Sequence, residues 1–274
     1  MTKARTNASA SPAVGRNMVI NGAMNVSQRS TSVADLGGST GYFTLDRYRW
    51  IAGSLAGRFT MSQTADGPNG ISANCLKVDC TTADTSIAAA ERLVLQHKIE
   101  SQNCQRIGKG VAGAKQVTVS FYVKASAAFT FGLEIFQSAH SRQCTKLFDT
   151  TTDWVRHELT FPADVDDGSS PIADDTTEGI VLQFWLHAGA TYTGGTLNTA
   201  AFANNTNANR AVGIDSIFSS TDNNFFITGV QMEVGPVATE FEQEQISTTL
   251  AKCQRYYYRP TTAGDLTGNT HVQA

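Results

Sequence analysis

The feature that most constrains the fold is an alternating run near the end of the chain, residues 225–236, which reads FFITGVQMEVGP. Its apolar residues, separated by polar or small ones, are Phe225, Ile227, Val230, Met232 and Val234. This alternation is typical of a β-strand with one buried face, and the Gly-Pro pair that follows favours a turn. A strand of this kind needs a sheet to join.

Similar runs recur along the chain, each bounded by Gly, Asp, Asn or Ser clusters that favour turns. We predict strands at 18–20, 42–52, 58–63, 75–80, 93–99, 116–126, 130–137, 154–161, 179–187 and 224–234. In 117–124 the odd positions are apolar and the even ones mostly polar, so one face of this strand should be buried and the other exposed to solvent. Because no amphipathic helix is expected between the strands, we predict an all-β fold, a jelly-roll-like antiparallel β-sandwich.

The ends of the chain differ from this pattern. Residues 1–16 are small and polar, and we predict an extended N-terminal anchoring arm, with a loose terminus as the alternative. Residues 17–244 form the predicted sandwich, and 245–274 a short C-terminal helix and tail. The helix is expected over 245–258, where Ile246, Leu250, Cys253 and Tyr257 are spaced four, three and four residues apart. A long strand-poor insertion, 189–223, is of the kind that often carries function.

Composition excludes several classes of protein. Charged residues are 16% of the chain and the net charge is -3, so we expect no nucleic-acid partner. No apolar run of about 18 residues occurs and the N-terminus lacks a signal-like apolar core, so we expect a soluble protein, made in the cytoplasm, without membrane insertion. The five cysteines follow no C-x-x-C spacing, and most of them are expected to be buried thiols. A Cys75–Cys80 disulfide would require a bend, because both residues lie on one predicted strand.

The sequence offers little catalytic chemistry. A glycan-cleaving enzyme needs two carboxylates about 5–9.5 Å apart across a cleft, and the candidates, none of them in a recognisable motif, are Glu134, Glu158, Glu178, Asp215 and Glu233. The histidines are scattered singly, and the acidic stretch 164–168 lacks the distal Glu of a calcium loop. We therefore predict no enzyme, no catalytic residue, no metal ligand and no cofactor.

Binding is the more probable use of the surface. Aromatic rings stack on sugars while amides bridge hydroxyls, so we predict glycan-binding residues in and beside the insertion, namely Trp185, Tyr192, Asn204, Asn205 and Asn207. The alternative is that Trp185 packs in the core, as Trp50 and Trp154 should, and that the Asn-rich text is an ordinary loop. Predicted assembly contacts are Arg5, Arg16, Leu250, Tyr256 and Tyr258. The tyrosine run could instead lie back over its own sandwich.

Five phrases resemble, in this order, a module of tail-fibre and other virion proteins of tailed bacteriophages: 15–26 with Gln28-Arg29, 45–50 (LDRYRW), 119–126 (VSFYVKAS), 227–235 with 239–242, and 250–258 (LAKCQRYYY). They are spread over nearly the whole chain. The resemblance implies a sandwich related in shape to carbohydrate-binding modules, displayed on a virion and often present in threefold copies.

The function implied by the resemblance is structural. We expect a virion protein, assembled in the host cytoplasm as a homotrimer with other virion proteins of the tail, baseplate or capsid. As a tail fibre, spike or receptor-binding appendage it would contact host surface glycans. The module begins near residue 17 without a shaft, so a capsid-decorating cement or head-fibre protein is the alternative. A glycan-depolymerising enzyme is the second alternative, and a secreted carbohydrate-binding module is disfavoured by the missing signal peptide.

Overall fold

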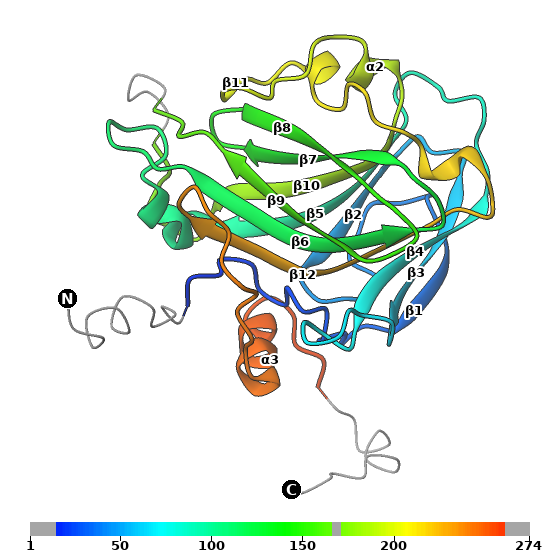
Figure 1. Ribbon diagram of the computed structural model, residues 1–274, viewed down its shortest axis with the longest axis horizontal. Coiled ribbons are helices and arrows are strands. Elements are labelled where there is room, and N and C mark those ends of the chain that lie inside the picture. The colour runs from blue at the N-terminus through cyan, green and yellow to red at the C-terminus, as the bar shows by residue number, and fades with distance from the viewer. Residues whose placement is uncertain (1–14, 166–170, 261–274) are drawn as a thin grey trace, which may run out of the picture.

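The structure, a computed structural model, describes residues 15–165 and 171–260 and contains two six-stranded antiparallel sheets that stack face to face (Figure 1). Sheet A has the order β1 (Ser32–Leu36), β3 (Arg58–Thr64), β4 (Cys75–Thr82), β12 (Asn224–Val234), β6 (Val117–Ala125) and β9 (Val155–Phe161). Sheet B has the order β11 (Ala203–Asn204), β8 (Arg142–Asp149), β7 (Thr130–Gln137), β10 (Glu178–Ala188), β5 (Arg92–Glu100) and β2 (Tyr48–Gly53). The predicted all-β, jelly-roll-like sandwich is confirmed.

The core fills the space between the two sheets. Alternate residues of facing strands point inward because side chains in a strand alternate between its faces. Phe121 of sheet A packs edge-to-face against Phe148 and Phe184 of sheet B, at ring distances of 5.0 and 5.2 Å, and all three are buried. Aromatic pairs in this geometry add specificity to the packing beyond the area they bury.

Strand β12 departs from simple alternation in the middle. Its buried apolar positions change phase between Ile227 and Val230, and the register with β6 shifts between Thr228 and Gln231, which is a β-bulge. Gly229 sits in the bulge with φ of 62°, and a Cβ there would lie 2.9 Å from Ile71 and from Tyr122. Only glycine fits this position without strain.

Several predicted elements need correction. Residues 18–20 form no strand, residues 42–47 precede β2, and β1, β8 and β11 were not predicted. Helices also occur between strands: the 3-10 helices η1 (Ser101–Ile107), η3 (Asn207–Asn209) and η4 (Ile217–Ser219), and the short α2 (Ala190–Thr193). The outer face of β6 is not exposed to solvent throughout, because Thr118 is buried and its hydroxyl donates to the Gly235 carbonyl at 2.7 Å.

The C-terminal helix α3 spans Ile246–Gln254, shorter than predicted. Figure 1 places α3 below β12, on the side where the described N-terminal segment runs, whereas α2 and β11 lie at the opposite side of the molecule. Most of the predicted arm, residues 1–14, lies outside the described residues. Among the helices of the described part, none is both long and apolar enough to cross a membrane.

Candidate functional site

Asp46 joins the beginning and the end of the described chain. Its buried carboxylate accepts hydrogen bonds from Gln28 and from Arg29, the latter at 3.1 Å, and its carbonyl accepts one from Asn21 at 3.0 Å. The Arg29 guanidinium lies 3.6 Å from the Tyr257 ring centre. Burial has the largest effect on Asp46 and raises the pKa of its carboxyl, although Gln28 and Arg29 act in the other direction.

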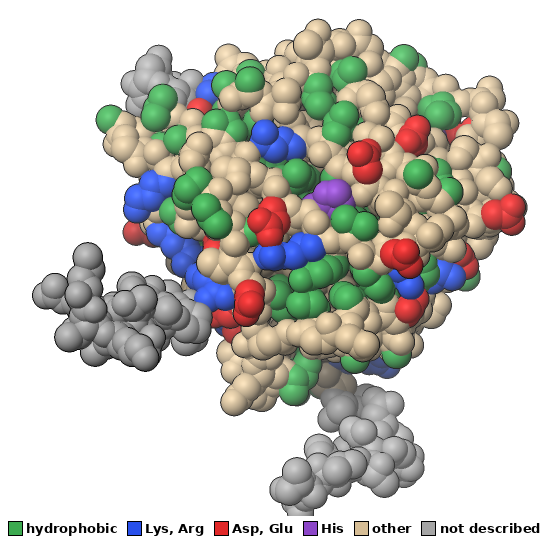
Figure 2. Space-filling view, viewed as in Figure 1, with side chains coloured by type: hydrophobic (Ala, Val, Ile, Leu, Met, Phe, Trp, Pro, Cys, Tyr) green, Lys and Arg blue, Asp and Glu red, His purple; other side chains and the backbone are tan. Residues whose placement is uncertain are grey.

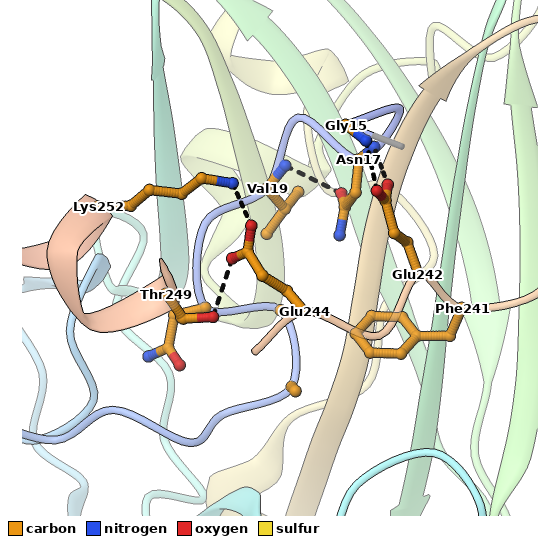
Figure 3. A pocket seen from close by; sticks show the side chains of 11 residues that line it. Gly15, Asn17, Val19, Phe241, Glu242, Glu244, Thr249 and Lys252 are labelled. Carbon is orange, nitrogen blue, oxygen red and sulfur yellow. Dashed lines mark hydrogen bonds and ion pairs between the residues drawn. The ribbon is translucent and has the colours of Figure 1, made fainter. Parts of the chain in front are cut away.

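A second set of contacts fastens the same two ends. Figure 3 shows the Glu242 carboxylate turned toward Gly15 and Asn17, whose backbone N–H groups donate to it, and Glu244 placed between Thr249 and Lys252. The N–H donors of Asn17 and Gly15 outweigh the effect of burial and hold the pKa of Glu242 below its ordinary value. We call the contacts around Asp46 and Glu242 the terminal clasp.

Several of the segments that resemble virion proteins of tailed phages supply residues of the terminal clasp. The segment 45–50 (LDRYRW) supplies Asp46, the segment 239–242 supplies Glu242, and the segment 250–258 supplies Tyr257. Gly22 belongs to the opening phrase, and a Cβ there would lie 2.1 Å from the Val230 carbonyl oxygen, so the two segments meet backbone to backbone. These residues therefore have a structural role within the chain.

A groove of about 670 Å³ opens beside the terminal clasp. It is lined by the backbone of residues 15–20, by η1 and by α3, and its charged side chains are Glu100, Arg106, Lys252 and Arg255. Arg106 donates to the carbonyls of Gly15 and Arg16 at 2.9 and 2.8 Å, and Arg255 pairs with Glu100 at 3.1 Å. The groove therefore presents both signs of charge and no single-sign patch.

The five predicted assembly residues differ in their surroundings. Arg5 lies outside the described residues, and the guanidinium of Arg16 donates to the Glu240 carbonyl at 2.7 Å. Tyr256 lies under the Arg47 guanidinium at 3.5 Å, so it folds back on its own sandwich. Leu250 is half-buried, whereas Tyr258 is 62% exposed. Ile246, one of the four apolar positions used to predict the helix, is 54% exposed, because α3 packs mainly through Thr249 and Cys253.

The outer face of sheet B carries a buried charge network. Glu134 on β7 is fully buried and accepts two hydrogen bonds from Arg210, at 2.9 and 2.8 Å. Trp185 Nε1 and Gln183 Nε2 on β10 each donate to the same carboxylate at 3.0 Å. A bidentate Arg–carboxylate pair is a strong and geometrically specific contact. Because Arg210 follows η3, this pair fastens the insertion to the sheet.

A hollow of about 150 Å³ lies next to this network on the outer face of sheet B. Its side chains include Gln96, Gln183, Arg92, Ser138 and Glu178, with Trp185, Phe136 and Arg210 at its margin. Gln96 donates to Gln183 at 2.7 Å and accepts from Arg49 at 3.2 Å, which fixes the orientation of both amides. We call this feature the sheet B hollow.

The predicted glycan-binding residues lie around this region but not together. Trp185 and Tyr192 are buried, 1% and 5% exposed, with their rings 5.3 Å apart beneath the insertion, so neither presents a free face to a sugar. Asn204 on β11 accepts a hydrogen bond from Arg142 at 3.1 Å, Asn205 is half-buried, and Asn207 is exposed at η3. Sequence reasoning missed Gln96 and Gln183, which the register of β5 and β10 brings together, and Arg210, which the fold of the insertion places beside them.

A second surface lies on sheet A. Trp154 was expected in the core but is half-buried on the outside, 6.3 Å from the Phe226 ring. Lys124 lies over both rings and forms an ion pair with Asp66 at 2.8 Å. Figure 2 shows acidic, basic and hydrophobic side chains interspersed over the face in view.

Each of the five candidate carboxylates has a hydrogen-bond or ion-pair partner within the protein. Glu134 is held by Arg210, Trp185 and Gln183, and therefore has no free lone pair directed at a substrate. Gln183 pairs with Glu134 across the strands, and Glu178 lies five residues before Gln183, about 16 Å along β10. The two side chains therefore leave the sheet from well-separated backbone positions. Glu158 and Glu233 belong to sheet A, and Asp215 accepts from the Thr130 backbone at 2.7 Å.

Other predicted features have clear outcomes. All five cysteines are buried and unpaired, as expected, and Cys75 and Cys80 form no disulfide. Asp164, considered as part of a calcium loop, instead pairs with Lys109 and with Arg142, the latter at 2.7 Å. These cations outweigh burial and lower the pKa of Asp164. Asp166 and Asp167 lie outside the described residues.

Comparison with known proteins gives structural likeness alone. No protein-family model matches the chain, and no curated protein matches it in sequence. A solved CBM4 structure is 13% identical with a TM-score of 0.39, over 79% of this chain and 99% of that one. A family 11 carbohydrate-binding module from Clostridium thermocellum, solved with a β-1,3-1,4-linked tetrasaccharide, is 11% identical with a TM-score of 0.35, over 76% of this chain and 97% of that one.

A phage protein is also among the similar structures. The enzymatically active domain of tailspike protein 4 from bacteriophage CBA120 is 9% identical with a TM-score of 0.39, over 80% of this chain. The match covers 21% of that tailspike chain. At these scores the likeness adds nothing to the β-sandwich that the sheets themselves establish.

Proposed function

We propose that this chain is a glycan-binding structural module carried on the particle of a tailed bacteriophage, and that the sheet B hollow binds the glycan. The observation that carries the proposal is the fixed row of amide groups, Gln96 and Gln183, placed beside Arg92, Ser138 and Glu178. Sugar hydroxyls are recognised by such converging donors and acceptors. The virion assignment is supported separately by the five phrases of the sequence.

The hollow is suited to weak recognition. Its volume of about 150 Å³ is below the roughly 300–1,000 Å³ of sites that enclose drug-sized ligands, so it would hold one sugar unit of a longer chain. A single module should therefore bind weakly. The homotrimer proposed from the resemblance would present three such sites, and linked sites raise the overall affinity without any new contact.

The sheet A surface is the weaker candidate for the same function. It offers the half-buried Trp154 and Phe226 rings for stacking, but Lys124 already lies over both of them. Its polar groups are also engaged, because Asp66 accepts from Lys124 and from the Trp154 indole. A sugar would have to displace these contacts, whereas at the sheet B hollow the bonds to Arg49 and Glu134 hold the two amides in place and leave each of them one further N–H and one further lone pair for a ligand.

The test is binding to an array of bacterial surface polysaccharides, followed by titration of the best ligand. Gln96→Ala should weaken binding about five- to tenfold, because it removes one oriented amide and frees another. Gln254→Ala, on the exposed face of α3, is the matched control and should bind as the wild type does. A loss confined to Trp154→Ala would move the site to sheet A. Absence of all binding, or release of new reducing ends, would overturn the proposal.

A further inference from the structure

The loop between β4 and β5 contains two buried acids in an otherwise exposed segment. Residues 85–90 are all exposed, whereas Asp84 and Glu91 are 6% and 3% exposed. The loop is fastened where these acids lie, because the Asp84 N–H donates to the Phe218 carbonyl and the Glu91 carbonyl accepts from the Gly189 N–H, both at 2.8 Å. Both carboxyl groups therefore point into the protein from well-held backbone.

His187, near the end of β10, faces the two acids. Its ring is fully buried, and its Nε2 lies 3.6 Å from a Glu91 carboxylate oxygen. One ligand atom from each of Asp84, Glu91 and His187 can be chosen so that all three lie within 4.8 Å of one another. Imidazole and carboxylate groups are ligands that metals take in proteins.

The charges of this cluster are not balanced by side chains. The buried acids Asp46, Glu134 and Asp164 each pair with Arg or Lys. Among residues 15–165 and 171–260, no Arg or Lys forms an ion pair with Asp84 or Glu91. Asp84 Oδ2 and His187 Nε2 are also buried without a hydrogen-bond partner. Leaving such groups unsatisfied is costly, and a cation placed between them removes the cost.

We propose that Asp84, Glu91 and His187 form a divalent-metal site, with Zn²⁺ as its ion. One imidazole nitrogen and two carboxylate oxygens are a ligand set that zinc accepts, whereas calcium and magnesium prefer oxygen ligands alone. Zinc binds at about 2.0–2.1 Å, so tetrahedral ligand atoms lie about 3.3 Å apart. The observed 3.6 Å between His187 Nε2 and Glu91 needs only a small closure.

The surroundings orient each ligand as an outer shell does in metal sites. His187 Nδ1 is hydrogen-bonded to the Ser216 hydroxyl at 2.7 Å, which leaves Nε2 for the ion. The Glu91 carboxylate accepts from the N–H groups of Ala56 and Ala88, at 3.2 and 3.0 Å, and Asp84 Oδ1 accepts from Ser86 at 3.1 Å. The free Asp84 Oδ2 is then the third ligand atom.

The bound ion would cross-link the two sheets. Asp84 follows β4 of sheet A, whereas Glu91 precedes β5 and His187 lies on β10, both in sheet B. The role is therefore structural. No short motif signals it, because the three residues lie at positions 84, 91 and 187 and meet only through the fold.

The test is metal analysis of the purified full chain together with its melting temperature. We expect one Zn²⁺ per chain after dialysis against buffered zinc, loss of that ion with a chelator, and a rise in Tm of roughly 5–10 °C at about a hundredfold excess over Kd. His187→Gln should abolish uptake. His97→Gln, the matched control, changes another buried histidine, which is bonded to the Ile20 carbonyl, and should retain the ion.

The variant Glu91→Gln distinguishes a zinc site from a metal-free cluster in which Asp84 and Glu91 share one proton. If zinc binds, the variant loses the ion and melts lower than the wild type in the presence of zinc. If the two acids instead share a proton, the Gln amide takes the place of the protonated carboxyl, Tm does not fall, and zinc has no effect on either protein. That second outcome, or zinc uptake that survives in His187→Gln, would overturn the proposal.

Discussion

Arg210 is the residue on which the outer face of sheet B most depends, because it is the only cation that pairs with Glu134 among the described residues. Arg210→Ala would leave a fully buried carboxylate unpaired, and we expect a loss of about 3–5 kcal/mol in the free energy of unfolding, measured by urea denaturation. Lys77→Ala, which removes a partly exposed pair with Asp79, should cost less than about 1 kcal/mol. Equal losses in the two variants would contradict this role for Arg210.

The Glu134–Arg210 network could not be predicted from residue types alone. Sequence reasoning correctly placed Trp185 beside the insertion, but its burial follows from Tyr192 and the insertion folding over the sheet. Glu134 was considered as one of five candidate acids for hydrolysis, none of them in a recognisable motif. Its partner Arg210 lies 76 residues away, in irregular structure, where no pattern predicts direction or contact.

At the scale of elements, sequence patterns succeeded where one face of a strand is apolar and failed where polar side chains are buried. Strands such as β5, β7, β10 and β12 are rich in apolar residues and were predicted near their observed bounds, although β10 is buried on both faces. Strand β8 was missed because Arg142, Gln143 and Thr145 are buried polar residues beneath the insertion, which hides the alternation. Strand β1 was missed because it is a short and mostly exposed edge strand.

The terminal clasp should be less stable in acid, so the segment 15–26 should open more often there. The pKa of Glu242 is held below its ordinary value of 4.5, so its contribution to stability is complete above about pH 4.5 and is lost as the pH falls through the lower folded value. The protection factors of peptides covering residues 15–26, which correct for the slower intrinsic exchange in acid, should therefore fall in acid before those of β12. Glu242→Gln should show faster exchange already at pH 7 and a weaker pH dependence. If exchange in this segment matches the wild type at both pH values, Glu242 does not hold it.

For the whole molecule, the arrangement of the chain ends suggests how the module would be mounted. Gly15 and α3 lie on one side of the sandwich at the terminal clasp, and the insertion with α2 and β11 lies on the other (Figure 1). Attachment through the ends would leave the insertion side exposed. We therefore expect that deleting residues 2–14, which leaves the clasp residues in place, preserves the melting temperature and the proposed trimer but abolishes incorporation into particles. Light scattering and immunoblots of purified particles measure these outcomes, and incorporation at wild-type levels would contradict the anchoring role.

The position of the module on the particle decides between the proposed function and capsid decoration. Labelled wild-type protein imaged on purified particles should lie on the tail if the sheet B hollow meets host glycans, because an attachment site must reach the cell surface first. In that case Gln96→Ala should reduce adsorption to host cells while leaving the copy number per particle unchanged. Label spread over the head, together with normal adsorption of Gln96→Ala particles, would instead assign the sandwich to capsid stabilisation, since a hollow that faces no receptor cannot affect attachment.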